Sequence, residues 1–470
     1  MKIFTLDHTP LLSVAAISDD VMKQIDAIEI DNHFKPNVVG NIYVGKVIAL
    51  AEGMEGAFVD IGLPTNAYIQ RNDLLRACKL TPSKVREQPL AKLVKKGQLI
   101  VAQVEKAPYQ TKGAQLSTDI SLTGDYVVFM PHMKGVKVSR KASGARNIET
   151  LEKNLTHVIG LQYGVIVRSA ALNSDVSDET IVAETNSLLN YWESLLNKIE
   201  LINNAKCIHL TNAFETALKE LLKTHLVDIF YVERVVDRDL LMRLGVEKKK
   251  IFVKASQTTL LQDHGLSLDQ VITATRQLSK EGVSVTVNEL EAFTIADVNS
   301  SKYNMDQSKR KNVFSVNAIA ADLILKQILM QKLSGVIMID FIDMTIDEQL
   351  SFIQHLLTHG YDKSHGILIE GFTTLGILEM TRKREVPSHK DLLSLKYHDG
   401  DMIFLQLHAL YCELKRLQNH TNAQRVTVEV EDALYIFLKQ NNIFDELTLK
   451  VDLKHNLSSQ KKYRIHTAKH

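Results

Sequence analysis

Two short apolar segments that each end on an aspartate constrain the fold of this chain most. Residues 290–299 close with Asp297-Val298-Asn299, and residues 335–344 carry Asp340 directly after an apolar run. Both segments are short and rich in β-branched residues, which is typical of buried strands. The residues between them, about 317–333, are mostly apolar and predict a helix packed on the sheet.

Ligands of open α/β sheets gather outside the carboxyl ends of strands. Asp297 and Asp340 are therefore candidate ligands of one divalent cation, because Mg²⁺ requires oxygen ligands. From spacing alone, a helix cap or a loop anchor is the more frequent role of an aspartate at a strand end. Downstream, Thr345 and Glu348 form a capping-box pattern for a helix that Gly360 ends, and residues 366–369 predict another strand.

The composition describes a soluble globular protein of two to four domains, with 470 residues, 45% hydrophobic and 24% charged. The formal net charge is +1, so any surface that binds nucleic acid must be local. Cys78, Cys207 and Cys412 are isolated and predict no disulfide framework, which fits a reducing cytoplasm. We expect neither a signal peptide nor a membrane span.

Residues 37–124 read as all-β, and residues 53–62 resemble the signature of an S1-type OB domain. Such barrels bind single strands by stacking bases on aromatic side chains over a basic groove. This predicts RNA contacts by the aromatic side chains of Phe58 and Tyr68 and phosphate contacts by Lys46 and Lys112. The alternative is that both aromatics are ordinary core residues.

The segments Asp297-Val298-Asn299-Ser300 and 339–344 together resemble the catalytic region of the ribonuclease E/G endoribonucleases. That family is also suited by three further features: the spacing of Asp297 and Asp340, the presence of Asn317 and Gln327 in the intervening helix, and the block 375–384. The resemblance implies a multidomain α/β (α+β) fold. Its parts would be an RNase H-like subdomain (1–36 and 208–275), an S1-type OB domain (37–124), a 5′-end-sensing region (125–207), a DNase I-like catalytic subdomain (276–386), and a linker with a small C-terminal domain (387–470).

The segments 111–118, 124–131 and 164–171 also resemble the family, in which they form a pocket for the 5′-monophosphate end of RNA. The matching positions are Arg168, Ser169 and Val128, the last through its backbone. Ser169 stands where the family usually has threonine, and it keeps the hydroxyl group. A guanidinium and a hydroxyl are suitable donors to a terminal phosphate. The alternative for Arg168 is a plain surface salt bridge.

The resemblance implies hydrolysis of single-stranded RNA in the cytoplasm, in rRNA processing and mRNA decay, with 5′-monophosphate ends favoured. Asp297 and Asp340 would bind Mg²⁺, or Mn²⁺ in its place, and cleavage would leave 5′-phosphate ends. Asn299 would hydrogen-bond and orient Asp340. Asp343 would support the site indirectly, through a helix N-terminus or a water.

The chain departs from the family in two places. Residues 387–393 contain no cysteine, so we expect no structural zinc and no zinc-linked tetramer, while a homodimer through other surfaces remains open. Leu329 and Gln331 lie in a helix where members carry arginines and glutamates, and Thr374 replaces an arginine. These losses favour an alternative, a catalytically weak or inactive RNA-binding regulatory protein of the same fold.

A third interpretation is an S1-type, ribosome-associated binding protein with an unrelated C-terminal half. It predicts that Asp297 and Asp340 lie far apart. His355 and His359 are four residues apart on a predicted helix, a spacing that can bind metal, but a solvated helix face is the better interpretation because no third ligand is evident.

Overall fold

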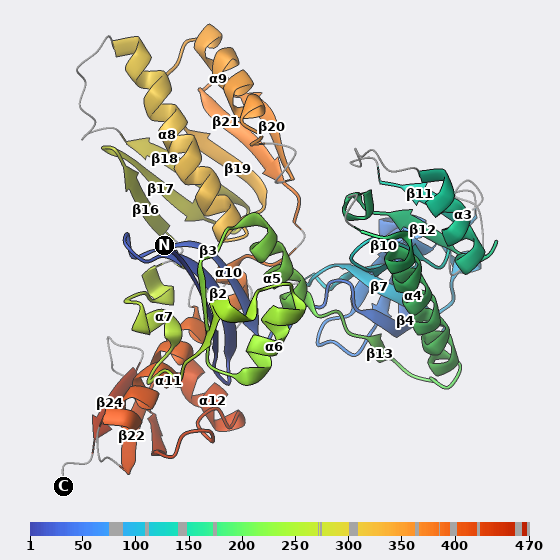
Figure 1. Cartoon of the computed structure of the whole chain (residues 1–470), viewed down its shortest axis with the longest axis horizontal. Helices are drawn as coiled ribbons and strands as arrows, with labels where there is room; N and C mark the ends of the chain where they lie inside the picture. Colours follow the sequence, from blue (N-terminus) through green and yellow to red (C-terminus); the bar gives the residue numbers. More distant parts are fainter. Residues whose placement is uncertain are drawn as a thin grey trace. The chain divides into compact units, whose positions relative to one another are not determined.

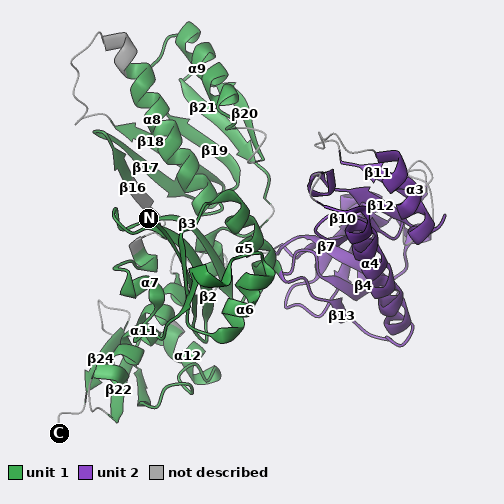
Figure 2. Ribbon diagram, in the orientation of Figure 1, with its two compact units in different colours: residues 1–37, 213–470 green, residues 38–212 purple. Residues whose placement is uncertain are grey.

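In a computed structural model the chain has a mixed α/β fold, which confirms the predicted fold class at that level. Contacts divide it into two compact units, residues 1–37 with 213–470, and residues 38–212 (Figure 2). The finer division into five parts stays a prediction. The structure describes residues 1–74, 88–108, 112–139, 148–172, 176–270, 272, 275–299, 309–361, 366–384, 386–394, 402–420, 424–455 and 463–467. Cys78 and Ser300 lie outside the described residues.

In the first unit, the N-terminal strands form a five-stranded sheet in the order β15-β14-β1-β2-β3. β1 pairs in parallel with β14, with Ile3 opposite Ile229, so the N-terminal piece completes a sheet from much later in the chain, as expected. One face of this sheet packs on Leu218 and Leu221 of α5. The elements are β1 (Lys2–His8), β2 (Leu12–Asp19), β3 (Gln24–Asn32), α5 (Ala213–Thr224), β14 (Ile229–Val232), α6 (Val235–Arg243), β15 (Ile251–Val253) and α7 (Leu260–Asp263).

A six-stranded sheet in the order β16-β17-β18-β19-β21-β20 follows in the same unit. Helices α8 and α9 lie along the sheet (Figure 1). Alternate residues of the strands, such as Val285, Ala296, Ile337 and Leu378, are buried in one core with the apolar residues of α8 and α9. The elements are β16 (Thr275–Lys280), β17 (Val283–Glu289), β18 (Phe293–Asn299), α8 (Lys309–Met330), β19 (Gly335–Asp340), α9 (Ile346–Thr358), β20 (Ile367–Phe372) and β21 (Ile377–Arg382).

Helix α8 begins at Lys309, in a polar, lysine-rich segment that precedes the predicted start at Asn317. Lysine and arginine favour helix formation, and the polar composition of this segment concealed its start. From Val313 to Met330, α8 is long and apolar enough to cross a membrane. It is instead a core helix, because its apolar side chains pack against the sheet.

Helix α9 begins with the predicted capping box, in which Thr345 and Glu348 each accept from the other's backbone N–H. It ends at Thr358, and Gly360 follows with a φ of 74°, as glycine near a helix C-terminus commonly does.

The C-terminal segment packs on the face of β2 and β3 that carries Leu12, Val14 and Ile28, which is the face away from α5. It contains two main helices and a three-stranded sheet in the order β23-β22-β24, and the sheet was not predicted. Val426, Val428 and Val430 alternate with polar residues and are buried, so the signal for the central strand was present. The elements are α10 (His389–Leu393), α11 (Ile403–His420), β22 (Arg425–Val430), α12 (Asp432–Gln440), β23 (Lys450–His455) and β24 (Tyr463–Thr467).

The second unit begins with a barrel in which five strands close through the pairing of β4 with β7. β13 pairs antiparallel with the first residues of β4, outside the closed barrel. A hydrogen bond joins the two ends of this unit. The Asn41 Oδ1 atom, near its start, accepts from the Thr211 backbone N–H, near its end, at 2.8 Å. The elements are β4 (Ile42–Ala51), β5 (Gly56–Asp60), β6 (Ala67–Gln70), α2 (Leu90–Leu93), β7 (Leu99–Lys106), β8 (Gln115–Ser117) and β13 (Lys206–His209).

The rest of this unit is a four-stranded sheet in the order β11-β12-β10-β9 with two helices packed on it. Trp192 and Leu195 of α4 are buried against Phe129 and Val165 of the sheet. The elements are β9 (Leu122–Thr123), β10 (Val127–Met130), β11 (Gly135–Val138), α3 (Ile148–Ile159), β12 (Gly164–Val167) and α4 (Asp178–Ile199).

Candidate active site

The two predicted metal ligands lie side by side on neighbouring parallel strands. Asp297 of β18 and Asp340 of β19 occupy the same register position, at the carboxyl ends of both strands. Their Cα atoms are therefore roughly 5 Å apart, and both side chains project from the same face of the sheet. Ala296 and Ile339 face the helices and are buried, so the two exposed aspartates lie on the open face. The third interpretation required distant aspartates, so this geometry argues against it.

Asn299 hydrogen-bonds to Asp297 in the structure, whereas the sequence argument expected it to hydrogen-bond and orient Asp340. Its side-chain Nδ2 donates to the Asp297 Oδ2 atom at 3.1 Å. Residues two apart on a strand lie on the same face, which explains why the amide reaches the aspartate of its own strand. The bond fixes one carboxylate oxygen of Asp297.

The loop after Asp340 is held by a buried amide on α8. Asn317 is fully buried, its Nδ2 donates to the Ile342 carbonyl at 2.9 Å, and its Oδ1 accepts from the Ile342 N–H at 3.1 Å. Asp343 follows as an exposed residue, two positions before the Thr345 cap of α9. The partial positive charge of a helix N-terminus favours carboxylates in its neighbourhood. The indirect role of Asp343 stays a prediction.

The positions that lack family arginines do not all belong to this edge of the sheet. α8 runs antiparallel to β18 and β19. Leu329 and Gln331 therefore lie near the start of β19, at the other end of the sheet from the aspartates. Gln331 is buried, and its backbone carbonyl accepts from the His389 N–H at 3.1 Å. Thr374, by contrast, lies in the turn before Ile377, which pairs with Asp340. Of these three positions, Thr374 is the one that lies toward the aspartate end of the sheet.

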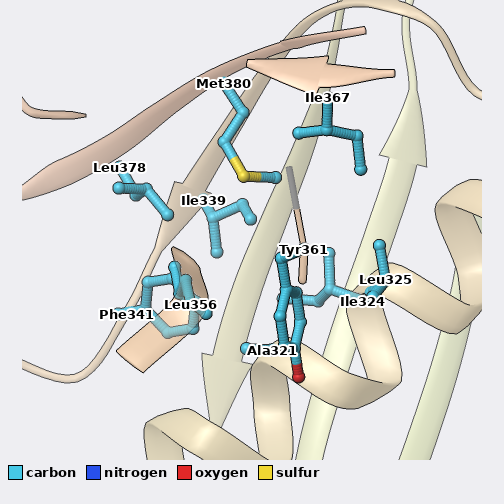
Figure 3. A pocket seen from close by; sticks show the side chains of 10 residues that line it. All are labelled: Ala321, Ile324, Leu325, Ile339, Phe341, Leu356, Tyr361, Ile367, Leu378 and Met380. Atoms are coloured by element: carbon cyan, nitrogen blue, oxygen red, sulfur yellow. The ribbon is translucent and has the colours of Figure 1, made fainter. Parts of the chain in front are cut away.

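The core beneath the aspartates is apolar. Figure 3 shows side chains from α8, α9 and strands β19 to β21 that converge around a small gap, with Ile339 and Phe341 flanking Asp340 in the sequence. These side chains fill the interior, and the one polar group among them, the Tyr361 hydroxyl, donates to the Asp322 carboxylate. Because these side chains are closely packed, the end of β19, which carries Asp340, is held rigidly.

The barrel places the predicted RNA-stacking residues together on its outer surface. Phe58 and Tyr68 are cross-strand partners on β5 and β6, with ring centroids 5.7 Å apart. Both are half-buried, whereas their strand neighbours Ala57, Val59, Ala67 and Ile69 are buried in the barrel. The two aromatics are therefore not core residues of the barrel.

The two predicted phosphate-binding lysines are exposed on the same barrel. Lys46 pairs with Asp60, which lies two residues from Phe58, so alternation places the three on one face. Lys112 precedes β8, whose Gln115 pairs with Tyr68. The RNA contacts of all four residues stay predictions.

The residues predicted to sense the 5′ end also lie close together. Val128 is in β10 opposite Ile166 of β12, and Arg168 and Ser169 follow that strand directly. The Arg168 guanidinium donates through Nη1 to the Gly124 carbonyl at 2.5 Å, and Ser169 is exposed. Within the described residues, the Arg168 guanidinium is held by this carbonyl and not by a salt bridge.

Two carboxylates suit a hard cation that keeps several water ligands, as Mg²⁺ does. Within the described ranges, no group of three or more histidine, cysteine, aspartate and glutamate side chains could hold a metal. The ring centroids of His355 and His359, at the end of α9, are 4.0 Å apart with the rings tilted by 43°. The His359 Nδ1 atom lies 2.8 Å from the His355 carbonyl, in keeping with a helix end.

Comparisons with known proteins place the chain among ribonucleases. It is 28% identical over 396 residues to ribonuclease G of Salmonella typhimurium, covering 81% of this chain and 79% of the relative. It is 27% identical over 394 residues to ribonuclease G of Haemophilus influenzae, with the same coverage. Ribonuclease E of a Nostoc species is 28% identical over 369 residues, covering 74% of this chain and 51% of the relative.

The ribonuclease E/G family model matches residues 121–385, which is more than half of the chain. The chain therefore belongs to the ribonuclease E/G family, as its motifs predicted. The match includes Val128, Arg168, Ser169 and both aspartates, so these residues lie in the part of the chain that defines the family.

Proposed function

We propose that this protein is a Mg²⁺-dependent endoribonuclease that cleaves single-stranded RNA and favours substrates with a 5′-monophosphate. The observation that carries the proposal is the register of Asp297 and Asp340, which brings two exposed carboxylates to one strand edge. Membership of the ribonuclease E/G family identifies RNA as the substrate class. The fold would comprise the RNase H-like, S1-type and DNase I-like parts that the sequence resembles.

Asp297 and Asp340 would hold the cation, with Mn²⁺ as an alternative to Mg²⁺. The bound ion would lower the pKa of a water and offset the charge that develops on the scissile phosphate. Asn299 holds the Oδ2 atom of Asp297 through its amide. Asn317 holds the backbone after Asp340, so the second carboxylate is presented from a fixed loop. Cleavage would leave a 5′-phosphate and a 3′-hydroxyl.

The barrel would bind the single strand through Phe58 and Tyr68. A base gains about 1–3 kcal/mol from stacking on an aromatic side chain, and such stacking tolerates any sequence. Lys46 and Lys112 would neutralise phosphates on either side. Arg168, Ser169 and the Val128 backbone would bind the terminal phosphate, for which a guanidinium offers several N–H donors.

The setting proposed for this activity is the cytoplasm, in rRNA processing and mRNA decay. Residues 387–393 contain no cysteine, so no zinc tetramer can form through thiolates of that segment. A homodimer through other surfaces is compatible with this. The loss of the arginine at Thr374 favours the alternative of a weak or inactive RNA-binding member, since the turn that contains Thr374 leads into Ile377, the strand partner of Asp340.

Cleavage of a short single-stranded RNA with a labelled 5′-monophosphate tests the proposal. We expect internal cuts with Mg²⁺, none with EDTA, and none with the Asp297→Asn or Asp340→Asn variants. RNA binding by the wild type without any cutting would support the binding-only alternative. Cutting that survives both substitutions would contradict the assignment of the aspartates.

A further inference from the structure

One carboxylate holds the turn beside the proposed 5′-phosphate residues. Glu184 of α4 accepts hydrogen bonds from three consecutive backbone N–H groups, those of Asp125, Tyr126 and Val127, at 2.5, 2.8 and 3.0 Å. Successive amides that converge in this way form an anion-binding concavity. Here the anion is supplied by the chain itself.

Gly124 at the start of this turn leaves room for the same contact. A Cβ atom at this position would lie 2.5 Å from the Glu184 Cδ atom, closer than a real Cβ contact allows. Any other residue at position 124 would push the carboxylate away from the three amides. The hydrogen bonds of Glu184 to this turn therefore depend on the absence of a side chain at position 124.

The carbonyl groups of the turn are bound by Arg168. Its Nη1 donates to the Gly124 carbonyl at 2.5 Å, and its backbone N–H donates to the Tyr126 carbonyl at 2.8 Å. Glu184 thus binds the N–H side of the turn while Arg168 binds the carbonyl side. The direction of the Gly124 carbonyl, set by the glutamate, determines where the guanidinium points.

We propose that Glu184 is a positioning residue for the recognition of the RNA 5′-monophosphate. It fixes the turn at 124–127, so that the Gly124 carbonyl takes one N–H of Arg168 and directs the remaining donors at the phosphate. Its charge does not repel that phosphate strongly, because three amide dipoles already surround it. The inference rests on the proposed preference for 5′-monophosphate ends, and Arg168 is the group that would touch the phosphate.

The test measures binding of two RNA oligonucleotides that differ only in a 5′-monophosphate or a 5′-hydroxyl. Fluorescence anisotropy in EDTA gives both Kd values for the full chain without cleavage, so the result does not depend on catalysis. The variants are Glu184→Gln, Gly124→Ala and Arg168→Gln. Glu193→Gln is the matched control, because Glu193 is an exposed glutamate on the same helix and its substitution removes the same charge.

We expect the wild type to prefer the 5′-monophosphate, and each of the three variants to lose roughly tenfold or more of that preference. The control keeps it. The Glu184→Gln/Arg168→Gln double variant should lose no more than Arg168→Gln alone, because the glutamate acts through the arginine. A non-additive loss of the 5′-monophosphate preference in the double variant would show that both residues act through the same contact, which a merely structural role of Glu184 would not give.

Three results would overturn the inference. If Arg168→Gln loses the preference and Glu184→Gln keeps it, the positioning role is wrong while 5′-end sensing stands. If the wild type has no preference, or Arg168→Gln does not change it, sensing itself fails. If Glu184→Gln does not fold, Glu184→Asp retains the charge on a shorter side chain, and an unchanged preference in both Glu184→Asp and Gly124→Ala would refute the role.

Discussion

Asn317 gives the most quantitative prediction about the candidate site. Its side chain is fully buried and satisfies both the N–H and the carbonyl of Ile342, in the loop that follows Asp340. In Asn317→Ala both backbone groups lose their partner. A buried polar group left unsatisfied costs about 1–3 kcal/mol. Because Ile342 is half-buried, the lower half of that range applies to each of its two groups, and we expect the free energy of local opening to fall by about 2–4 kcal/mol.

Hydrogen exchange measured by mass spectrometry on peptides that contain Ile342 reports this opening directly. The predicted loss corresponds to an exchange rate for the Ile342 amide raised roughly 30- to 700-fold. Asn197→Ala serves as the control, because Asn197 is exposed on helix α4. Circular dichroism melts establish that both variants are folded. If the Ile342 amide exchanges in Asn317→Ala as it does in the wild type, the buried amide does not hold the loop and the reasoning is wrong.

Three further predictions concern the barrel and the buried titratable groups. Phe58→Ala and Tyr68→Ala should each weaken binding of single-stranded RNA by about 1–3 kcal/mol in an anisotropy titration, while Tyr191→Ala, on a helix of the same unit, should not. Burial, with Lys332 nearby, lowers the pKa of His389 to about 3. Only the unfolded chain then takes up a proton below pH 6.5, so the free energy of unfolding in urea should fall as pH drops, by up to roughly 1.4 kcal/mol per pH unit, and His389→Gln should flatten this slope. Burial raises the pKa of Asp7 to about 7, so its contribution has the opposite sign: stability present at pH 4 is lost as pH rises through 7, and Asp7→Asn should remove that loss.

The elements that carry the aspartates could be predicted because the pattern there is strong. Short β-branched runs, a long apolar helix and a capping box each have a local physical signature. The register between β18 and β19 could not be predicted, because it depends on how α8 returns the chain across the sheet. The same limit applies at Asn299, whose residue type indicates a hydrogen bond to a carboxylate but not which one.

Glu184 had no signal in the sequence at all. Its partners are backbone amides about 60 residues upstream, and no side-chain pattern marks a backbone donor. Asn317 was noted only because it suits the family, and its role became evident once Ile342 was placed beside it. The helix start at Lys309 was missed for a different reason, since lysine-rich segments suit both a solvated loop and an exposed first turn.

The central claim is that Asp297 and Asp340 together hold one catalytic cation. Titration of the protein with Mn²⁺, followed by electron paramagnetic resonance of the free ion, measures this directly in wild type, Asp297→Asn and Asp340→Asn. Asp347→Asn, an exposed aspartate in the first turn of α9, is the control. We predict one Mn²⁺ site that weakens at least about tenfold in either site variant and is unchanged in the control, as expected when one of two charged ligands is lost. Equal Mn²⁺ affinity in all four proteins would contradict the account.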